Sequence, residues 1–221
     1  MSKLTVLITG ASKGIGKAIS DLLTQDDTYE ILTPSHHDLD LSNRESIRTY
    51  CRKHPNIDIL INNAGINILG TVDSLSDDDI DAMLGTNLIG PIALIREVVP
   101  SMKNAGYGKI INISSIWGIR SKENRTLYSA TKFALNGVTK SLARELGSYN
   151  ILVNSVCPGY VNTELTQKNV PQEEQVKIKA TIPLGRFAQP DEIAQTVAFL
   201  ISKNNTYITG QTIIIDGGFL A

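Results

Sequence analysis

The sequence predicts a single α/β domain spanning residues 1–221 and built on a doubly wound parallel sheet. Short β-branched runs alternate with amphipathic helical stretches along the whole chain, which is typical of this fold class. The predicted strands are continuous apolar runs, as expected when helices cover both faces of a parallel sheet. A length of 221 residues and a hydrophobic content of 42% suit one domain with a sizeable core.

In the first part of the chain, two predicted helices separate three predicted strands. The expected strands are 4–8, 29–33 and 57–61, and the expected helices are 14–25 and 42–54. The second helix opens with Ser42-Asn43-Arg44-Glu45, which has the S-x-x-E form of a capping box.

A longer predicted helix begins the second part of the chain and runs from about Ser76 to Lys103. Ser76 can cap its first turn, and the three aspartates that follow favour the positive end of a helix. The remaining expected strands are 109–114, 151–156 and 212–216, and the remaining expected helices are about 127–147 and 190–203.

One interval is too short for the regular alternation. Only PSHHDLD separates Thr33 from the predicted cap at Ser42. A parallel crossover needs about a dozen residues or more, so two full strands with a helix between them do not fit. We therefore expect the crossover helix that such folds normally place between the second strand and a third, edge strand, ahead of the helix at 42–54, to be missing or truncated. The segment should run extended along the sheet edge, with any third strand short.

Bulk composition excludes several classes of function. A net charge of −1 and a pI near 6.3 give no electrostatic basis for binding nucleic acid or an anionic membrane. No signal peptide is visible, and no apolar run approaches the roughly 20 residues that span a bilayer.

We expect a cytoplasmic protein in which Cys51 and Cys157 are reduced thiols. No metal site is expected, because His36, His37 and His54 form no paired-histidine motif.

A glycine-rich turn follows the first strand in TGASKGIG (residues 9–16). Glycines permit a tight turn and let a pyrophosphate approach the backbone at the start of the next helix. The spacing is G-x-x-x-G-x-G, and a turn with only a structural role is the alternative. The predicted dinucleotide contacts in this turn are Gly10, Ser12, Lys13, Gly14, Ile15 and Gly16.

The identity of the dinucleotide depends on the end of the second strand. An acidic residue about 20 residues beyond such a turn commonly holds the adenosine ribose of NAD. In this chain that count reaches His36, next to Ser35, and Lys13 adds positive charge. This combination favours NADP(H) over NAD(H). Asp38 and Asp40 keep NAD(H) open as the alternative, since either carboxylate could turn toward the ribose.

Tyr128 and Lys132 form the strongest catalytic candidate. Their i, i+4 spacing places both side chains on one face of the predicted helix. A nearby ammonium stabilises a phenolate, so Lys132 is expected to lower the pKa of Tyr128 toward 7 and make it an efficient proton donor or acceptor. Ser115 follows the KIINIS strand. Ligands of open α/β sheets bind outside the carboxyl ends of the strands, so Ser115 should lie beside the cofactor and polarise a substrate carbonyl.

These motifs together resemble the short-chain dehydrogenase/reductase family, whose fold is Rossmann-like. The likeness is strongest to its 3-oxoacyl-[acyl-carrier-protein] reductase type. The matching segments are TGASKGIG (9–16), NNAG (62–65), Asn87 in GTNLIG, Ser115 in NISS, Tyr128-SAT-Lys132, PGYVNT (158–163) and PLGRFAQPDEIA…GQTIIIDGG (183–218).

The resemblance implies a role for each matching residue. Tyr128 would be the general acid/base, and Lys132 would bind the nicotinamide ribose and lower the tyrosine pKa. Ser115 would hold the substrate oxygen, and Asn87 would position a water in a proton relay. Further cofactor contacts would be Asn63, Ala64 and Gly65, Asp40 and Leu41 beside the adenosine, and Pro158, Gly159, Val161 and Thr163 beside the nicotinamide and pyrophosphate. Structural roles remain open for Asn87, at a helix irregularity, and for Gly159, in a turn.

The implied reaction is NADP(H)-dependent hydride transfer between the nicotinamide and a carbonyl or secondary alcohol. A 3-oxoacyl thioester or related ketone is the favoured substrate, and a sugar or nucleotide sugar is the alternative. A non-catalytic cofactor sensor is disfavoured, because Ser115, Tyr128 and Lys132 are all present.

Several features near the substrate stay open. Arg120 and Arg125 either meet an anionic substrate or are solvated loop charges, in a segment that also holds Trp117. Residues 164–188 resemble a mobile lid. The resemblance also implies a homo-oligomer, a tetramer or dimer, formed by the helices near 79–103 and 127–147 and the last strand.

Overall fold

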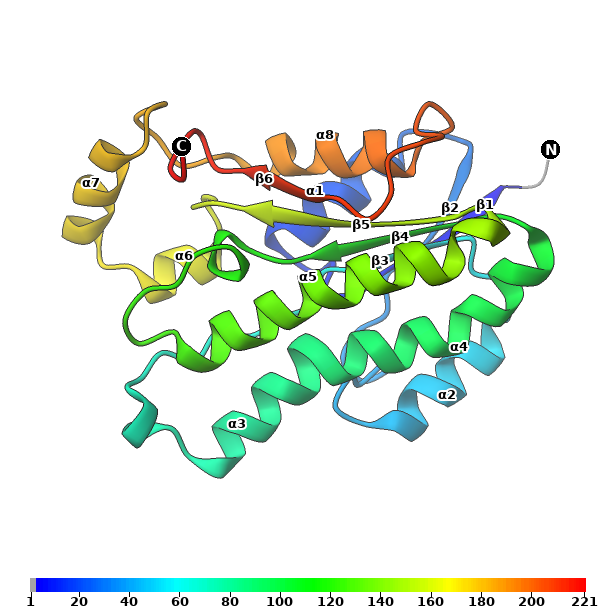
Figure 1. Cartoon of the computed structure of the whole chain (residues 1–221), viewed down its shortest axis with the longest axis horizontal. Coiled ribbons are helices and arrows are strands. Elements are labelled where there is room, and N and C mark those ends of the chain that lie inside the picture. The colour runs from blue at the N-terminus through cyan, green and yellow to red at the C-terminus, as the bar shows by residue number, and fades with distance from the viewer. Residues whose placement is uncertain (1–2) are drawn as a thin grey trace.

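A computed structural model describes residues 3–221 as a six-stranded parallel sheet with helices on both faces (Figure 1). The spatial order of the strands is β2-β1-β3-β4-β5-β6, and every neighbouring pair is parallel. The strand bounds are β1 (Leu4–Ile8), β2 (Tyr29–Leu32), β3 (Ile59–Asn62), β4 (Gly108–Ile113), β5 (Ile151–Pro158) and β6 (Thr212–Ile215). This arrangement confirms the predicted fold class.

The helices form two layers, one on each face of the sheet. On one face α1 (Gly14–Leu23) packs against α8 (Pro190–Ile201), and on the other lie α2 (Arg44–Lys53), α4 (Gly90–Ala105) and α5 (Thr126–Leu146) (Figure 1). Two short helices, α6 (Glu164–Asn169) and α7 (Gln172–Thr181), lie beyond the carboxyl ends of the strands.

Alternation along β1 shows why the strands read as continuous apolar runs. Val6 and Ile8 belong to the core cluster beneath α1 and α8, whereas Leu7 points into the opposite cluster beneath α2 and α4. All three side chains are fully buried. Burying such a side chain contributes about 1.5–3 kcal/mol, so both faces stabilise the sheet.

The short interval after β2 contains neither helix nor strand. Residues 33–43 pass directly from β2 to α2, so no crossover helix forms there, and β2 is an edge strand. The expected extended course is wrong, however. The N–H groups of Asp38 and Leu39 donate to the carbonyl of Ser35 at 3.1 and 3.0 Å, which closes a turn. The turn carries Leu39 and Leu41 into the core, and their burial offsets the missing regular structure.

Helix α2 begins one residue later than its capping-box motif predicts. Asn43, not Ser42, caps it, because the Asn43 Oδ1 accepts hydrogen bonds from the N–H groups of Glu45 and Ser46 at 2.9 and 3.2 Å. The Ser42 hydroxyl instead donates to Asp40 at 2.7 Å.

The predicted long helix is interrupted by a π-helical turn. It divides into α3 (Asp77–Leu84), the π-helical segment Gly85–Ile89, and α4. The expected cap is present at its start, where Ser76 and Asp79 form a reciprocal capping box: the Asp79 N–H donates to the Ser76 hydroxyl, and the Ser76 N–H donates to the Asp79 carboxylate.

The combined helix Asp77–Ala105 is long and apolar enough to cross a membrane by length and composition alone. Its most apolar window has a mean hydropathy of 1.3, and 44% of that window is buried within the protein. Packing in the core accounts for the composition, because Leu94, Val98 and Met102 of α4 are buried against the sheet.

Candidate active site

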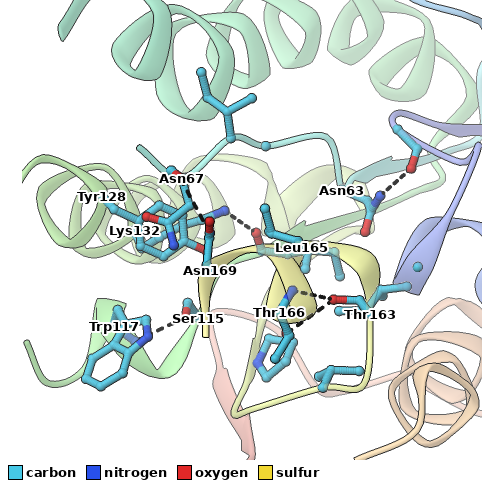
Figure 2. A pocket seen from close by; sticks show the side chains of 18 of the residues that line it. Asn63, Asn67, Ser115, Trp117, Tyr128, Lys132, Thr163, Leu165, Thr166 and Asn169 are labelled. Atoms are coloured by element: carbon cyan, nitrogen blue, oxygen red, sulfur yellow. Dashed lines mark hydrogen bonds between the residues drawn. The ribbon is translucent and has the colours of Figure 1, made fainter. Parts of the chain in front are cut away.

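A cavity of about 410 Å³ lies at the carboxyl ends of the strands, where ligands of open α/β sheets bind. At one end are Ser115, Tyr128 and Lys132, and at the other are Asn63 and Thr163 (Figure 2). The predicted site residues that line it are Gly10, Ser12, Lys13, Gly14, Ile15, Asn63, Ala64, Gly65, Ser115, Tyr128, Lys132, Pro158, Gly159, Val161 and Thr163.

The glycine-rich turn has the geometry that a pyrophosphate requires. Gly10 and Gly14 have φ values of +66° and +57°, a region of backbone conformation that residues other than glycine rarely adopt. Helix α1 has no side-chain cap, so the N–H groups of its first turn are free to bind an anion. In contrast, Asn43 caps α2 and Ser76 caps α3. The turn therefore fits the phosphates of a dinucleotide.

The NNAG segment after β3 is hydrogen-bonded to this turn through Thr9 and Asn63. The Thr9 hydroxyl accepts from the N–H groups of Asn63 and Ala64, both at 3.0 Å. The Asn63 amide donates to the carbonyls of Thr9 and Gly10 at 3.0 and 2.9 Å. Gly16 does not line the cavity, but any side chain there would overlap Asn63. The role of Thr9 was not predicted; its one signal is a hydroxyl directly after an apolar strand.

Lys13 is not a free positive charge. Its ammonium lies 2.8 Å from the carboxylate of Glu164, the first residue of α6. Thr163, which caps α6, also approaches the position that a Gly14 side chain would occupy. The predicted lid thus contacts the phosphate-binding turn, and the lysine proposed for a 2′-phosphate already has an anionic partner.

The four residues predicted on the adenosine side do not line this cavity. Ser35 donates from its hydroxyl to Asp38 at 2.6 Å, and Asp40 accepts from the N–H and hydroxyl groups of Ser42 at 2.9 and 2.7 Å. These hydrogen bonds hold the pKa of both carboxyls below its usual range. Leu41 is buried in the core, and His36 is exposed. The short segment after β2 thus turns its polar groups toward one another.

Ser115 and Lys132 are held by the backbone around them. The Ser115 hydroxyl accepts from the N–H of Trp117 at 3.2 Å, which caps a 3-10 turn after β4. The Lys132 ammonium donates to the carbonyl of Ile113 at 2.8 Å and lies 5.6 Å from the centre of the Tyr128 ring (Figure 2). Three of the four predicted catalytic side chains, Ser115, Tyr128 and Lys132, therefore face one cavity.

The pKa of Tyr128 shifts in the direction opposite to the prediction. Burial raises the pKa of its phenol, while the Ser115 hydroxyl and the Arg125 guanidinium act to lower it. Burial also lowers the pKa of Lys132 to about 8. The expected lowering by Lys132 is not found, because removal from water destabilises the charged forms of both groups.

Asn87 lies in the π-helical turn and does not line the cavity. Its amide accepts from the N–H of Ile66 and donates to the carbonyl of the same residue, each at 2.8 Å. It also donates to the Thr131 hydroxyl at 3.3 Å. These bonds join the loop after β3 to α5, so Asn87 has a structural role. The water relay stays a prediction.

The two arginines of the loop before α5 differ in environment. Arg120 is exposed, whereas Arg125 is buried and lines the cavity beside Trp117. Two polar residues near them were not predicted: Asn67 and Asn169, from the loop after β3 and from α6, contact each other at the cavity wall (Figure 2).

Similarity to known proteins agrees with this geometry. A family model described as enoyl-(acyl carrier protein) reductase matches residues 38–220. The 3-oxoacyl-[acyl-carrier-protein] reductase FabG of Rickettsia felis is 39% identical, covering 98% of this chain and 96% of the relative.

Two solved structures superpose over nearly their whole length. One, described as ElxO with NADP bound, has a TM-score of 0.89 and 30% identity, covering 99% of each chain. The other, a 4-hydroxyisoleucine dehydrogenase complexed with NADH, has a TM-score of 0.88 and 32% identity, covering 98% of each chain. The chain is an oxidoreductase that belongs to the short-chain dehydrogenase/reductase family, close to the 3-oxoacyl-[acyl-carrier-protein] reductases.

Proposed function

We propose that the protein uses NADP(H) to interconvert a ketone and a secondary alcohol, with a 3-oxoacyl thioester or related ketone as the reducible substrate. One observation carries this proposal: Ser115, Tyr128 and Lys132 share a cavity with the uncapped, glycine-rich start of α1. The relative named as a 3-oxoacyl-[acyl-carrier-protein] reductase supports this type of substrate.

Each of these side chains has a distinct task in the proposed reaction. When bound, the nicotinamide supplies or accepts the hydride. Ser115 donates a hydrogen bond to the carbonyl oxygen, and Tyr128 gives that oxygen a proton as negative charge develops on it. Lys132 binds the nicotinamide ribose. The raised pKa keeps Tyr128 protonated at neutral pH, which favours its action as an acid and hence ketone reduction.

Substitution of Tyr128 tests the reaction. We expect Tyr128→Phe to lower kcat by about 100- to 10,000-fold, the usual contribution of a positioned general acid. NADPH absorbance would be followed with a panel of 3-oxoacyl thioesters, simple ketones and sugars. Tyr149→Phe, on an exposed tyrosine, is the control. Unchanged turnover in Tyr128→Phe, or cofactor binding without oxidation across the panel, would contradict the proposal.

The preference for NADP(H) rests on Lys13 in the phosphate-binding turn and on the sequence directly after β2, where Ser35 and His36 take the place of a carboxylate. We expect tighter binding of NADPH than of NADH, measured by fluorescence titration. Lys13→Ala should weaken NADPH binding about tenfold and leave NADH unchanged, as for loss of one charge-assisted contact. Lys17→Ala, in the same helix, is the control. Equal or tighter binding of NADH by the unmodified protein would contradict the proposed preference for NADP(H).

The protein is further proposed to act as a single catalytic domain and as a cytoplasmic homo-oligomer, a tetramer or dimer. Exposed apolar side chains on α4 and α5 support the association: Ile92 is 40% exposed, and Phe133 is 46% exposed.

A further inference from the structure

Arg125 is a buried cation in the wall of the cavity. Its side chain is only 8% exposed, although charged side chains are rarely buried to this extent unless they are paired. It is the N-cap residue of α5, three residues before Tyr128, and both residues line the cavity. The guanidinium also acts electrostatically on both Tyr128 and Tyr160. Arg125 therefore lies close to the proposed reaction centre.

No acidic residue in the described chain neutralises this charge. Among residues 3–221, no carboxylate lies within ion-pair distance of the guanidinium. Glu174, the acid that acts on the same Tyr160, is 3.1 Å from Lys122. The contact made by Arg125 is with the ring of Trp117, whose centre is 5.1 Å away.

The ring supports one side of the guanidinium and leaves its N–H donors unused. A cation–π contact stabilises a cation without engaging its N–H groups, and no hydrogen bond from these groups is found within residues 3–221. Because the guanidinium lines the cavity and has no acidic partner within residues 3–221, its position there points to an anion from outside the chain. The planar fork of arginine matches a carboxylate in a two-point hydrogen bond.

We propose that the preferred substrate is a short oxo-carboxylate, whose carboxylate pairs with Arg125 while its ketone oxygen meets Ser115 and Tyr128. This inference rests on the proposed function and, of the two substrates named there, favours the related ketone over the 3-oxoacyl thioester. Because Arg125 and Tyr128 line the same cavity and are three residues apart in sequence, the carboxylate should lie a few bonds from the ketone. A thioester at that position is neutral and would leave the guanidinium unpaired. Arg125 binds the substrate and takes no part in hydride or proton transfer.

A pair of probes that differ in this one group tests the inference. Acetoacetate and the N-acetylcysteamine thioester of acetoacetate present the same ketone with an anionic and a neutral neighbour. With NADPH, the unmodified protein should have the higher kcat/KM for acetoacetate. Arg125→Gln should lower that value by about 10- to 100-fold, since a hydrogen-bonded charge is lost, and change the thioester value by less than about threefold.

Two further variants serve as controls. Arg120→Gln removes an exposed arginine from the same loop and should change neither kcat/KM value. Arg125→Lys keeps the charge without the planar fork and should retain a reduced preference for acetoacetate.

A binding measurement gives a readout that does not depend on turnover. Trp117 is the sole tryptophan of the chain and lies beneath Arg125, so its fluorescence reports on the site. With NADP⁺ present, butyrate should change the fluorescence of the unmodified protein saturably, and the neutral butyramide should not. Arg125→Gln should abolish the butyrate response. If that variant fails to fold, the comparison of the two probes in the unmodified protein decides.

Three outcomes would overturn the inference: no preference of the unmodified protein for acetoacetate, equal losses on both probes in Arg125→Gln, or a butyrate response no greater than that to butyramide. Any of these with the thioester still reduced leaves the proposed function intact. If no ketone is reduced, the proposed function fails, and the butyrate titration still decides whether Arg125 is an anion site.

Discussion

Lys132 is a buried ammonium whose protonation is sensitive to pH near neutrality. Burial lowers its pKa to about 8, and the carbonyl of Ile113 accepts its hydrogen bond. A side chain at Gly65 would make an ordinary contact with the ammonium at 3.6 Å and a tighter one with the Oδ1 of Asn87 at 3.3 Å. The charge needed to bind a ribose is therefore fully present only below about pH 8.

This shift predicts the alkaline limit of ketone reduction. We expect kcat/KM to fall as the pH rises through about 8, because Lys132 loses its proton while Tyr128, whose pKa is raised, keeps its own. Initial rates across the neutral and alkaline range would locate the inflection, since kcat/KM reports groups of the free enzyme. A profile that stays flat up to the ordinary lysine pKa of 10.5 would contradict this assignment.

Glu164 is placed to compete with a cofactor phosphate for Lys13. Its carboxylate is 2.8 Å from the ammonium, and both side chains are exposed, so the pair contributes at most about 1 kcal/mol. We expect Glu164→Gln to tighten NADPH binding by up to about fivefold, with a smaller gain at high salt because salt screens exposed charges. Glu173→Gln, an exposed neighbour on α7, is the control in the fluorescence titration. Weaker NADPH binding by Glu164→Gln would rule out competition.

At the scale of elements, the π-helical turn determines where the loop after β3 runs. The extra residue in this turn directs the Asn87 amide toward the backbone of Ile66, with which it forms two hydrogen bonds. Beyond the turn the helix continues as α4. Gly90 permits the next turn to approach the core, because a side chain there would overlap the carbonyl of Leu41. The sequence indicates an irregularity of the helix near Asn87, but it does not show that the irregularity is a π-helical turn.

The Asn87 contacts predict a loss of stability upon truncation. Asn87→Ala would leave the N–H and carbonyl of Ile66 unpaired, so we expect the free energy of unfolding to fall by about 1–3 kcal/mol. Urea denaturation would measure the change. Asn104→Ala, at an exposed position near the end of α4, should have little effect. A loss in activity with unchanged stability would instead favour the water relay.

The positions of the strands can be predicted from the sequence because their side chains are buried on both faces of the sheet. All six strands lie within two residues of their predicted bounds, because burial on both faces makes them continuous apolar runs. The Lys13–Glu164 pair could not be predicted, since its partners are 151 residues apart in sequence. The pKa of Tyr128 depends on how the lid and the loop before α5 exclude water. The burial of Arg125 likewise depends on how the lid and the loop before α5 pack together.

At the scale of the whole molecule, α4 and α5 present apolar residues away from the sheet. Phe133 on α5 is 46% exposed, and Ile92 on α4 is 40% exposed. We expect Phe133→Asp to convert the proposed oligomer to a smaller species, because a charge at a buried interface is unfavourable. Sedimentation velocity would measure this against the chain mass of 24.0 kDa. Val176→Asp, on the exposed side of α7, is the control. A monomeric unmodified protein would remove the basis for an oligomer.

The direct passage from β2 to α2 leaves the outer side of β2 without a neighbouring strand. An open sheet edge can recruit strands from other molecules and so promote aggregation. Here the edge is only four residues long, and it carries the exposed charge of Glu30. Pro34 follows closely and offers no N–H for further pairing. The shortened fold therefore ends at an edge whose own sequence discourages self-association.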